Sequence, residues 1–292
     1  MFLQARKELH KLNRMPWAFH DFWLRDMDFA DGEAALVKTP PGVKKSKFAF
    51  FPGCQLGASE PRYVADTYSW LLSKEPTMGL FLKCCGTPVK WAGDEEKHAE
   101  AISKLHTDWE ELGKPKLVVA CPSCMDNISE FLPDIEIISL YEFMEKNGVV
   151  PAMKGDRETW SIFDPCASAG KDDLRKSIRN LAESANFQLE PLPVQENHSA
   201  CCSYGGHVSV ANPKYADFII DRRITESENP YITYCINCRD AFLGAGKKTI
   251  HILDVIFGDG CVDGHASLPT VTERRENRIA LKEQLLKNIW GE

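Results

Sequence analysis

Cysteine is the residue type in this sequence whose number and spacing could do chemistry. The chain has 292 residues and 11 cysteines, well above the usual share for a soluble protein. Its first residues, MFLQARKELHKLNRMPWAFH, lack the apolar core and the cleavage site of a signal peptide, so we expect a cytoplasmic protein. In a reducing compartment, clustered cysteines more often bind metal or perform redox chemistry than form disulfides.

Ten of the cysteines fall into two matching groups, each with one distant cysteine, an adjacent pair and a C-x-x-C motif. The first quintet is Cys54, Cys84, Cys85, Cys121 and Cys124. The second quintet is Cys166, Cys201, Cys202, Cys235 and Cys238. Equivalent cysteines lie 112 to 117 residues apart, which indicates a duplicated module. Cys261 is left over, and we expect it to be an ordinary surface or packing residue.

The sequence around the cysteines repeats as well. FAFFPGC at 48–54 matches SIFDPC at 161–166, LVVACPSC at 117–124 matches YITYCINC at 231–238, and IEIISLYEFM at 135–144 matches TIHILDVIFG at 249–258. The duplication therefore predicts four segments: an N-terminal extension (1–46), a first module (47–150), a second module (151–260) and a helical C-terminal tail (261–292).

Short, apolar, β-rich runs end at or near most of these cysteines, and helical patterns lie between them. The helical stretches that we predict are 60–73, 94–112, 124–131, 171–186 and 213–227. Strands that alternate with helices are typical of βαβ units, so we predict an α/β fold with parallel sheets. The cysteines then lie where strands run out into loops, the edge at which open α/β sheets build their sites.

Five thiolates in each module favour a multi-iron cluster over a single zinc ion. Thiolates select zinc, copper(I) and iron–sulfur clusters, and structural zinc uses four ligands. The side chains of an adjacent Cys-Cys pair diverge, so the pair serves two metals of a larger cluster more easily than one ion. The run CxxCxxCxxxCP of ordinary ferredoxins is absent. A zinc-stabilised scaffold with no colour and no redox activity is the alternative.

Composition limits the possible partners. The net charge is −7, which argues against nucleic acid as the main partner. No apolar run approaches the length of a membrane-spanning helix, and no G-x-G-x-x-G follows a strand as in flavin or nicotinamide sites. If the chain transfers electrons, they must therefore arrive through another protein.

With both quintets identified, the chain resembles the cysteine-rich CCG-domain proteins typified by the cysteine-rich subunit of heterodisulfide reductase. The resemblance covers roughly residues 47–258 in two copies. It implies two modules related by pseudo-two-fold symmetry, with a non-cubane [4Fe-4S] cluster held by each quintet. It also implies that a disulfide is cleaved or formed between the clusters. Two features depart from the family pattern: the first cysteine gap is short, and Ser203 stands where a glycine is expected.

The implied reaction suggests further residues. A disulfide needs two electrons and its thiol products need protons, for which His207, after Gly205 and Gly206, is the nearest candidate. Lys83, Lys90 and Arg239 are candidates for holding an anionic substrate. We thus expect catalytic roles for His207, Arg239 and Lys90, beside the ten cysteines as cluster ligands.

The chain ends lie outside the repeat. Residues 273–290 form an expected amphipathic helix with Leu281, Leu285 and Ile289 on one face. Such faces could cover the protein's own modules or dock onto partner subunits. The resemblance implies a ferredoxin-type iron–sulfur subunit and a flavin-containing subunit as partners.

The function that we predict is the iron–sulfur catalytic subunit of a heterodisulfide reductase-like complex, an oxidoreductase of anaerobic metabolism that acts on a small disulfide or thiol. The alternative is an electron-relay subunit of a flavoprotein oxidoreductase, such as a complex that oxidises hydroxy acids. In that case the clusters would pass electrons on and bind no disulfide.

Overall fold

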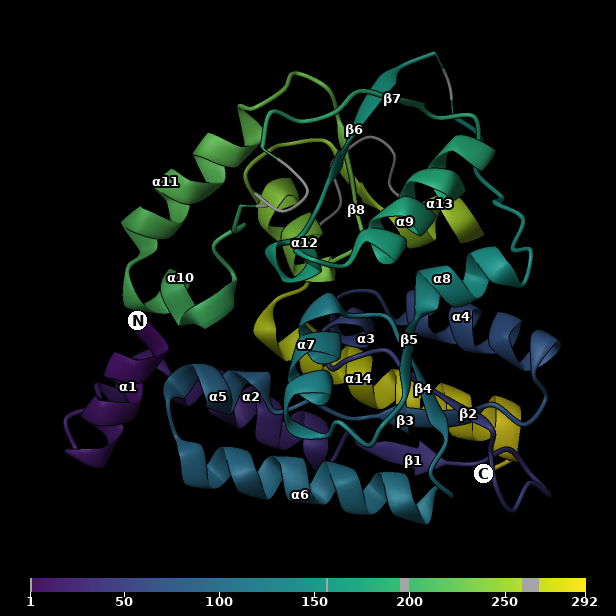
Figure 1. The fold of residues 1–292 in the computed structure, drawn as a ribbon, viewed down its shortest axis with the longest axis horizontal. Coiled ribbons are helices and arrows are strands. Elements are labelled where there is room, and N and C mark those ends of the chain that lie inside the picture. Colours follow the sequence, from purple (N-terminus) through teal and green to yellow (C-terminus); the bar gives the residue numbers. More distant parts are fainter. Residues whose placement is uncertain (1, 156, 195–199, 259–267) are drawn as a thin grey trace. The chain divides into compact units, whose positions relative to one another are not determined.

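The structure is a computed structural model that describes residues 2–155, 157–194, 200–258 and 268–292 (Figure 1). It divides into two compact units. Unit 1 comprises Met1–Ile138, Gly205–Asn212 and Val271–Glu292, and unit 2 comprises Ser139–Tyr204 and Pro213–Thr270. No helix in the described ranges is long and apolar enough to cross a membrane.

Unit 1 is built on a sheet with the strand order β1-β3-β2-β4-β5. The strands are β1 (Leu36–Lys38), β2 (Phe48–Phe51), β3 (Gly79–Leu82), β4 (Lys116–Val119) and β5 (Ile137–Ser139). Strand β2 runs parallel to β3 and β4, whereas the edge strand β1 is antiparallel to β3. Most side chains of β2, β3 and β4 are buried, as expected for a parallel sheet covered on both faces.

Unit 2 repeats this arrangement without the antiparallel edge strand. Its sheet has the order β7-β6-β8-β9. The strands are β6 (Thr159–Phe163), β7 (Gln188–Leu189), β8 (Tyr231–Thr233) and β9 (Thr249–His251), all paired in parallel. Because β3-β2-β4-β5 and β7-β6-β8-β9 follow the same order along the chain, the duplication seen in the sequence is also a duplication of topology.

The helices confirm the predicted alternation. The five predicted stretches correspond to α4 (Pro61–Lys74), α6 (Glu95–Glu111), α7 (Pro122–Phe131), α9 (Asp172–Ser184) and α11 (Pro213–Ile224). Proline in the first turn begins α4 and α7, and the Asp94 side chain caps α6 by accepting a hydrogen bond from the Lys97 backbone N–H. The α/β fold with parallel sheets is therefore confirmed.

Several short elements were not predicted. In unit 1 they are α1 (Phe2–Lys11), η1 (Trp17–Phe19), α2 (Asp21–Asp31), α3 (Leu56–Ser59), α5 (Thr87–Ala92), η4 (Gly205–His207) and α10 (Val208–Ala211). In unit 2 they are α8 (Leu140–Lys146), η2 (Cys166–Ser168), α12 (Ile236–Gly244) and α13 (Ile252–Phe257). Strand–helix pairs β5–α8 and β9–α13 account for the matching segments 135–144 and 249–258.

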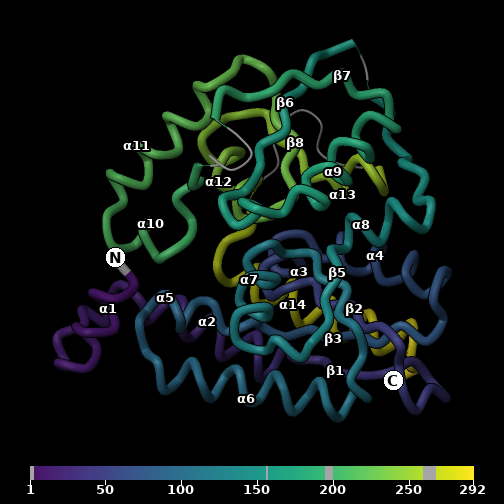
Figure 2. The backbone as a smooth tube through the Cα atoms, in the orientation of Figure 1, coloured from purple at the N-terminus to yellow at the C-terminus, as the bar shows by residue number. Residues whose placement is uncertain are grey.

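Both chain ends pack onto unit 1. The C-terminal helix α14 (Val271–Leu285) continues into the single turn η5 (Leu286–Trp290), and it returns to lie against α3 and α4 (Figure 2). Leu281 and Leu285 are buried, and Trp290 stacks on Tyr68. The Trp290 indole N–H also donates to the Thr39 carbonyl, just after β1. The apolar face of α14 therefore covers its own module, the first of the two roles considered for it.

Candidate functional site: the two cysteine quintets

The strands bring each quintet to one edge of its sheet. Cys54 follows β2, Cys84 follows β3 and Cys121 follows β4, each by two or three residues. Because these strands are parallel, their carboxyl ends meet at the same edge. In unit 2, Cys166 follows β6 and Cys235 follows β8 in the same way. Within each unit, the fold therefore gathers cysteines that lie far apart in the sequence.

All five thiols of the first quintet are linked by side-chain contacts. The sulfurs of Cys54 and Cys84 lie 3.5 Å apart. Hydrogen bonds from Cys124 and Cys84 hold the pKa of Cys85 well below the ordinary thiol value, and contact with Cys121 raises the pKa of Cys124. Cys84, Cys85 and Cys124 are buried, while Cys54 and Cys121 are half-buried.

Neighbouring residues support this first site closely. Gly53 has a φ of +79°, and a Cβ atom there would lie 3.2 Å from the Cys124 sulfur and 3.2 Å from the Cys121 Cβ. The Asp31 carboxylate accepts a hydrogen bond of 2.7 Å from the Cys84 backbone N–H, and burial raises the pKa of Asp31 to about 6. The Thr87 hydroxyl lies 3.1 Å from the Cys85 sulfur. The segments that carry these cysteines are thus held both by the backbone conformation at Gly53 and by the side chains of Asp31 and Thr87.

The second quintet is assembled in the same way but is more open. The sulfurs of Cys202 and Cys238 lie 3.1 Å apart, and contact with Cys238 lowers the pKa of Cys235. Contact with Cys201 raises the pKa of Cys166. Cys166 is exposed, whereas its counterpart Cys54 is half-buried. The two quintets therefore share the same arrangement of cysteines and differ in exposure.

Ser203 adopts a backbone conformation that favours glycine. Its φ is +69°, and the equivalent residue of the first quintet, Gly86, has a φ of +84°. Ser203 is 2% exposed, and its backbone N–H donates to the Cys201 sulfur at 3.2 Å. The departure from the family pattern therefore keeps the geometry that glycine would give, at the cost of backbone strain.

His207 lies in an aromatic cage in unit 1. Its ring is fully buried and stacks on Trp23, with Trp91 edge-on, and its Nδ1 lies 2.7 Å from Nδ1 of His20. Burial and the nearby charges of His20 and Arg6 lower the pKa of His207 to about 3. Burial and Arg6 lower the pKa of His20 to about 4. Both rings are therefore neutral at pH 7.

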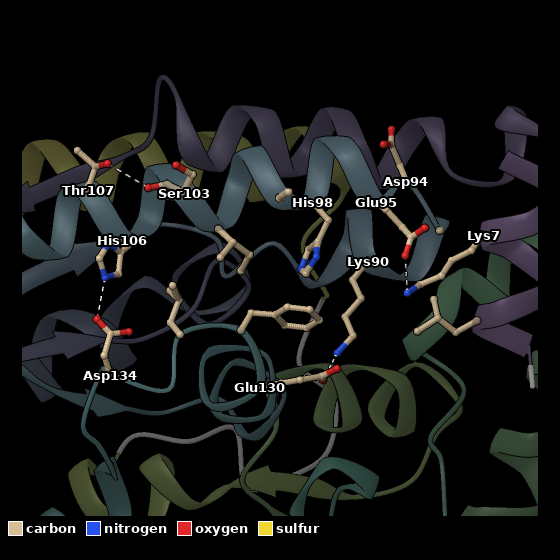
Figure 3. Close-up of a pocket in the computed structure, with 16 residues that line it drawn as sticks. Lys7, Lys90, Asp94, Glu95, His98, Ser103, His106, Thr107, Glu130 and Asp134 are labelled. Atoms are coloured by element: carbon tan, nitrogen blue, oxygen red, sulfur yellow. Dashed lines mark hydrogen bonds and ion pairs between the residues drawn. The ribbon is translucent and has the colours of Figure 1, made fainter. Parts of the chain in front are cut away.

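The predicted anion-binding residues lie in different places. Lys83 pairs with Asp108 in unit 1. Lys90 pairs with Glu130 at an open cavity of about 520 Å³, into which His98 also points (Figure 3). Arg239 is buried on α12 in unit 2, with its guanidinium 3.4 Å from Asp240. Each of the three cations thus lies beside a carboxylate of its own unit.

The donor set fits an iron–sulfur group. Each quintet offers five soft sulfur ligands, backbone N–H groups reach sulfur, and Gly53 leaves room that a side chain would fill. Across the described ranges, no group of three or more His, Cys, Asp or Glu side chains is arranged to hold a single metal ion. Cys261 lies outside the described residues, so its expected role stays a prediction.

Sequence reasoning missed the residues around the first quintet. Asp26 and Asp31 lie in an aromatic, charged segment for which we predicted no element. Arg278 lies on the predicted C-terminal helix, for which we considered only the apolar face. Thr87 and Asn127 follow cysteines by two and three residues, and the Asn127 amide donates to the Cys85 carbonyl. Proximity in sequence could have found the last two, but nothing in the sequence pointed to the first three.

The comparisons with known proteins agree with this geometry. The chain is 21% identical over 203 residues to an EtfAB:quinone oxidoreductase from Syntrophomonas wolfei subsp. wolfei (strain DSM 2245B / Goettingen). That match covers 65% of this chain but only 28% of the relative. No solved structure matches the chain. The profile of the CCG cysteine-rich domain matches residues 48–129 and 160–242, more than half of the chain. The chain therefore belongs to the CCG cysteine-rich domain family, with two copies of the domain.

Proposed function

We propose that this chain is an iron–sulfur electron-transfer subunit of an oxidoreductase, with one cluster held by each quintet. The observation that carries the proposal is the gathering, twice in one chain, of five cysteines at the carboxyl ends of parallel strands, with thiol–thiol contacts inside each quintet. Family membership suggests iron–sulfur clusters, and the similarity to an EtfAB:quinone oxidoreductase suggests an electron-transfer role. The number of clusters and their non-cubane type are part of the proposal.

Each quintet would supply the ligands, and a bound cluster would supply one-electron transfer. Burial of Cys84, Cys85 and Cys124 excludes water from most of the first site. The backbone N–H of Ser203 donates to sulfur, a contact that stabilises added negative charge. The residues of the chain thus bind, orient and shield the group.

Partner subunits are a second part of the proposal. The chain spans 28% of the length of the relative that it matches. No flavin or nicotinamide fingerprint is present in the sequence. We therefore propose that electrons enter through a flavin-containing subunit and a ferredoxin-type subunit.

Disulfide reduction is the second candidate function, and the exposure of Cys166 favours it. Reduction of a disulfide consumes two electrons and two protons and releases two thiols, so two one-electron groups could supply one electron to each sulfur. His207 is neutral and caged, which suits a positioning role better than proton donation. Lys90 and Arg239 stay proposed anion-binding residues for this candidate.

One experiment separates the two candidates. The protein is purified without oxygen, and its EPR spectrum is recorded after addition of a small disulfide and, separately, after addition of a reduced flavoprotein. A paramagnetic signal induced by the disulfide would establish a disulfide reaction. A response to the flavoprotein alone would establish the electron relay. Zinc without acid-labile sulfide would contradict both.

A further inference from the structure

A buried ion pair formed by the two ends of the chain lies at the first quintet. Arg278 on α14 and Asp26 on α2 are 252 residues apart in sequence, and each is 5% exposed. Their contact is bidentate, with Nη1 2.7 Å from Oδ1 and Nη2 2.8 Å from Oδ2. Two parallel hydrogen bonds of this kind fix the orientation of both side chains.

The same pair reaches Cys54 by two routes. The Arg278 Nε donates to the Cys54 carbonyl at 2.9 Å. The Gln55 amide donates to Asp26 at 2.9 Å and lies 3.9 Å from the Cys54 sulfur. Asp26 therefore orients two donors, and each of them contacts Cys54.

The cation is the member of the pair that contacts Cys54 directly, through its Nε, whereas Asp26 reaches Cys54 only through Gln55. Burial opposes the charge of Arg278, but the hydrogen bond to Asp26 and the nearby thiols of Cys54 and Cys84 outweigh burial and raise its pKa. Burial likewise opposes the charge of Asp26, whose pKa is lowered by Arg278, Gln55 and Arg275. The second quintet has different ion pairs beside it: Asp164, two residues before Cys166, binds Arg179 and accepts from Tyr234, and Arg239, directly after Cys238, pairs with Asp240.

We propose that Arg278 is a positioning residue that fixes the Cys54 loop and places a permanent positive charge beside the first quintet, so that a cluster held there is easier to reduce. This inference rests on the proposed cluster at that site. A charge in a buried, low-dielectric position acts strongly on a neighbouring redox group, and nearby charge is one of the factors that set cluster potentials. Neither residue lies within the matched family segments.

The test is a cycle of four variants: Arg278→Gln, Asp26→Asn, the double variant and Arg278→Lys. Iron and acid-labile sulfide are measured first, and the midpoint potential of each cluster is then measured by redox titration. We expect Arg278→Gln to lower one midpoint potential, because the negative charge of Asp26 is left without its cation. We expect Asp26→Asn to raise the same potential, because the positive charge of Arg278 is left without its anion.

The midpoint potential of the double variant should lie between those of the two single variants, and that of Arg278→Lys should lie nearer the wild type than that of Arg278→Gln because lysine keeps the positive charge. A tenfold change in the ratio of oxidised to reduced cluster corresponds to 59 mV for one electron. Lys282→Gln is the matched control, because it removes another cation of α14, one turn after Arg278. The Lys282 ammonium donates to the Glu33 carbonyl. Shifts of the same sign in both single variants, no shift in either, or loss of cluster iron from both would overturn the charge assignment.

A second measurement uses the metal-free protein and is independent of any cluster. Iodoacetamide alkylation of each cysteine is followed by mass spectrometry. We expect Arg278→Gln and Asp26→Asn to speed the alkylation of Cys54 several-fold and to leave that of Cys166 unchanged. Unchanged Cys54 reactivity in both variants would overturn the positioning role. Absence of iron and sulfide from the wild type would instead contradict the proposed function while leaving this readout intact.

Discussion

At the scale of single residues, Ser203 holds a left-handed backbone conformation that costs a non-glycine residue about 1 kcal/mol. We predict that Ser203→Gly raises the free energy of unfolding of the metal-free protein by up to that amount and leaves the iron content intact. Gly86→Ala is the reciprocal control, because it places a Cβ at a φ of +84° where the nearest atoms are 3.5 Å away. Urea denaturation and iron analysis check both variants. Loss of second-site iron in Ser203→Gly would show that the hydroxyl has a role in that site.

Gly53 brings the backbone close to Cys121 and Cys124 of the first quintet. We predict that Gly53→Ala loses the iron of the first site, about half of the total, because the new Cβ would press on Cys121 and Cys124. Gly42→Ala controls for backbone strain, since Gly42 has a similar φ of +77° but nothing within 4 Å of an added Cβ. Iron per chain is the measurement. Equal iron in the two variants would contradict this account of Gly53.

The sequence was sufficient to identify the ligands but not their surroundings. Ten cysteines in two matching quintets predict the sites, because spacing alone showed the duplication. The bidentate contact of Asp26 with Arg278 joins residues at opposite ends of the chain, and no local pattern signals such a contact. His207 was expected at the second motif as a proton donor, but tertiary packing places it in a cage of unit 1.

At the scale of elements, long periodic helices and apolar strands were predictable, and short elements were not. Helices α4, α6 and α9 show the expected periodicity, so their existence followed from the sequence. We did not predict α1 and α2, although both helices are as amphipathic as α4 and α6, and β1 has only three residues. Helices this short are marginal in isolation, so packing on unit 1 contributes to the stability of α1 and α2.

Helix α14 is an integral part of unit 1. A Cβ on Gly57 of α3 would lie 2.5 Å from the Leu281 side chain, which shows how closely the two helices approach. We predict that Leu281→Ala lowers the free energy of unfolding by about 3 kcal/mol, the usual cost of removing a buried leucine side chain. The exposed Glu283→Ala on the same helix is the control and should change stability little. Similar stability of the two variants would indicate that α14 does not depend on this contact.

The segment η4–α10 is held by a pair of neutral histidines. The pKa of His207 is lowered to about 3 and that of His20 to about 4, whereas an unfolded histidine titrates near 6.5. The unfolded chain therefore takes up protons first as the pH falls, and stability is lost from about pH 6.5 downward until the folded pKa values are reached.

We predict that the metal-free protein is less stable at pH 5 than at pH 7.5, with each histidine contributing on the order of 2 kcal/mol to the difference. In His207→Phe this difference should shrink, because one titrating group is removed from the cage. Urea denaturation at the two pH values measures it. An unchanged pH dependence in the variant would show that the histidine pair is not responsible.

At the scale of the whole molecule, one duplicated topology carries two sites of unequal character. Both sheets place five thiols at the same edge, and within the described residues both chain ends contribute side chains beside the first quintet: Asp26, Asp31 and Arg278. The second site has an exposed cysteine. The duplication thus gives two quintets of the same spacing whose surroundings differ.

The central claim is one iron–sulfur cluster in each quintet, and counting iron in matched variants tests it most directly. Iron and acid-labile sulfide are measured per chain in anaerobically purified wild type, Cys124→Ser, Cys238→Ser and the double variant, with zinc measured in parallel. The account predicts about eight irons and eight sulfides in the wild type, as for two [4Fe-4S] clusters. It predicts half of each in either single variant and none in the double variant. Zinc in place of iron, or a single variant that loses all iron, would contradict the account.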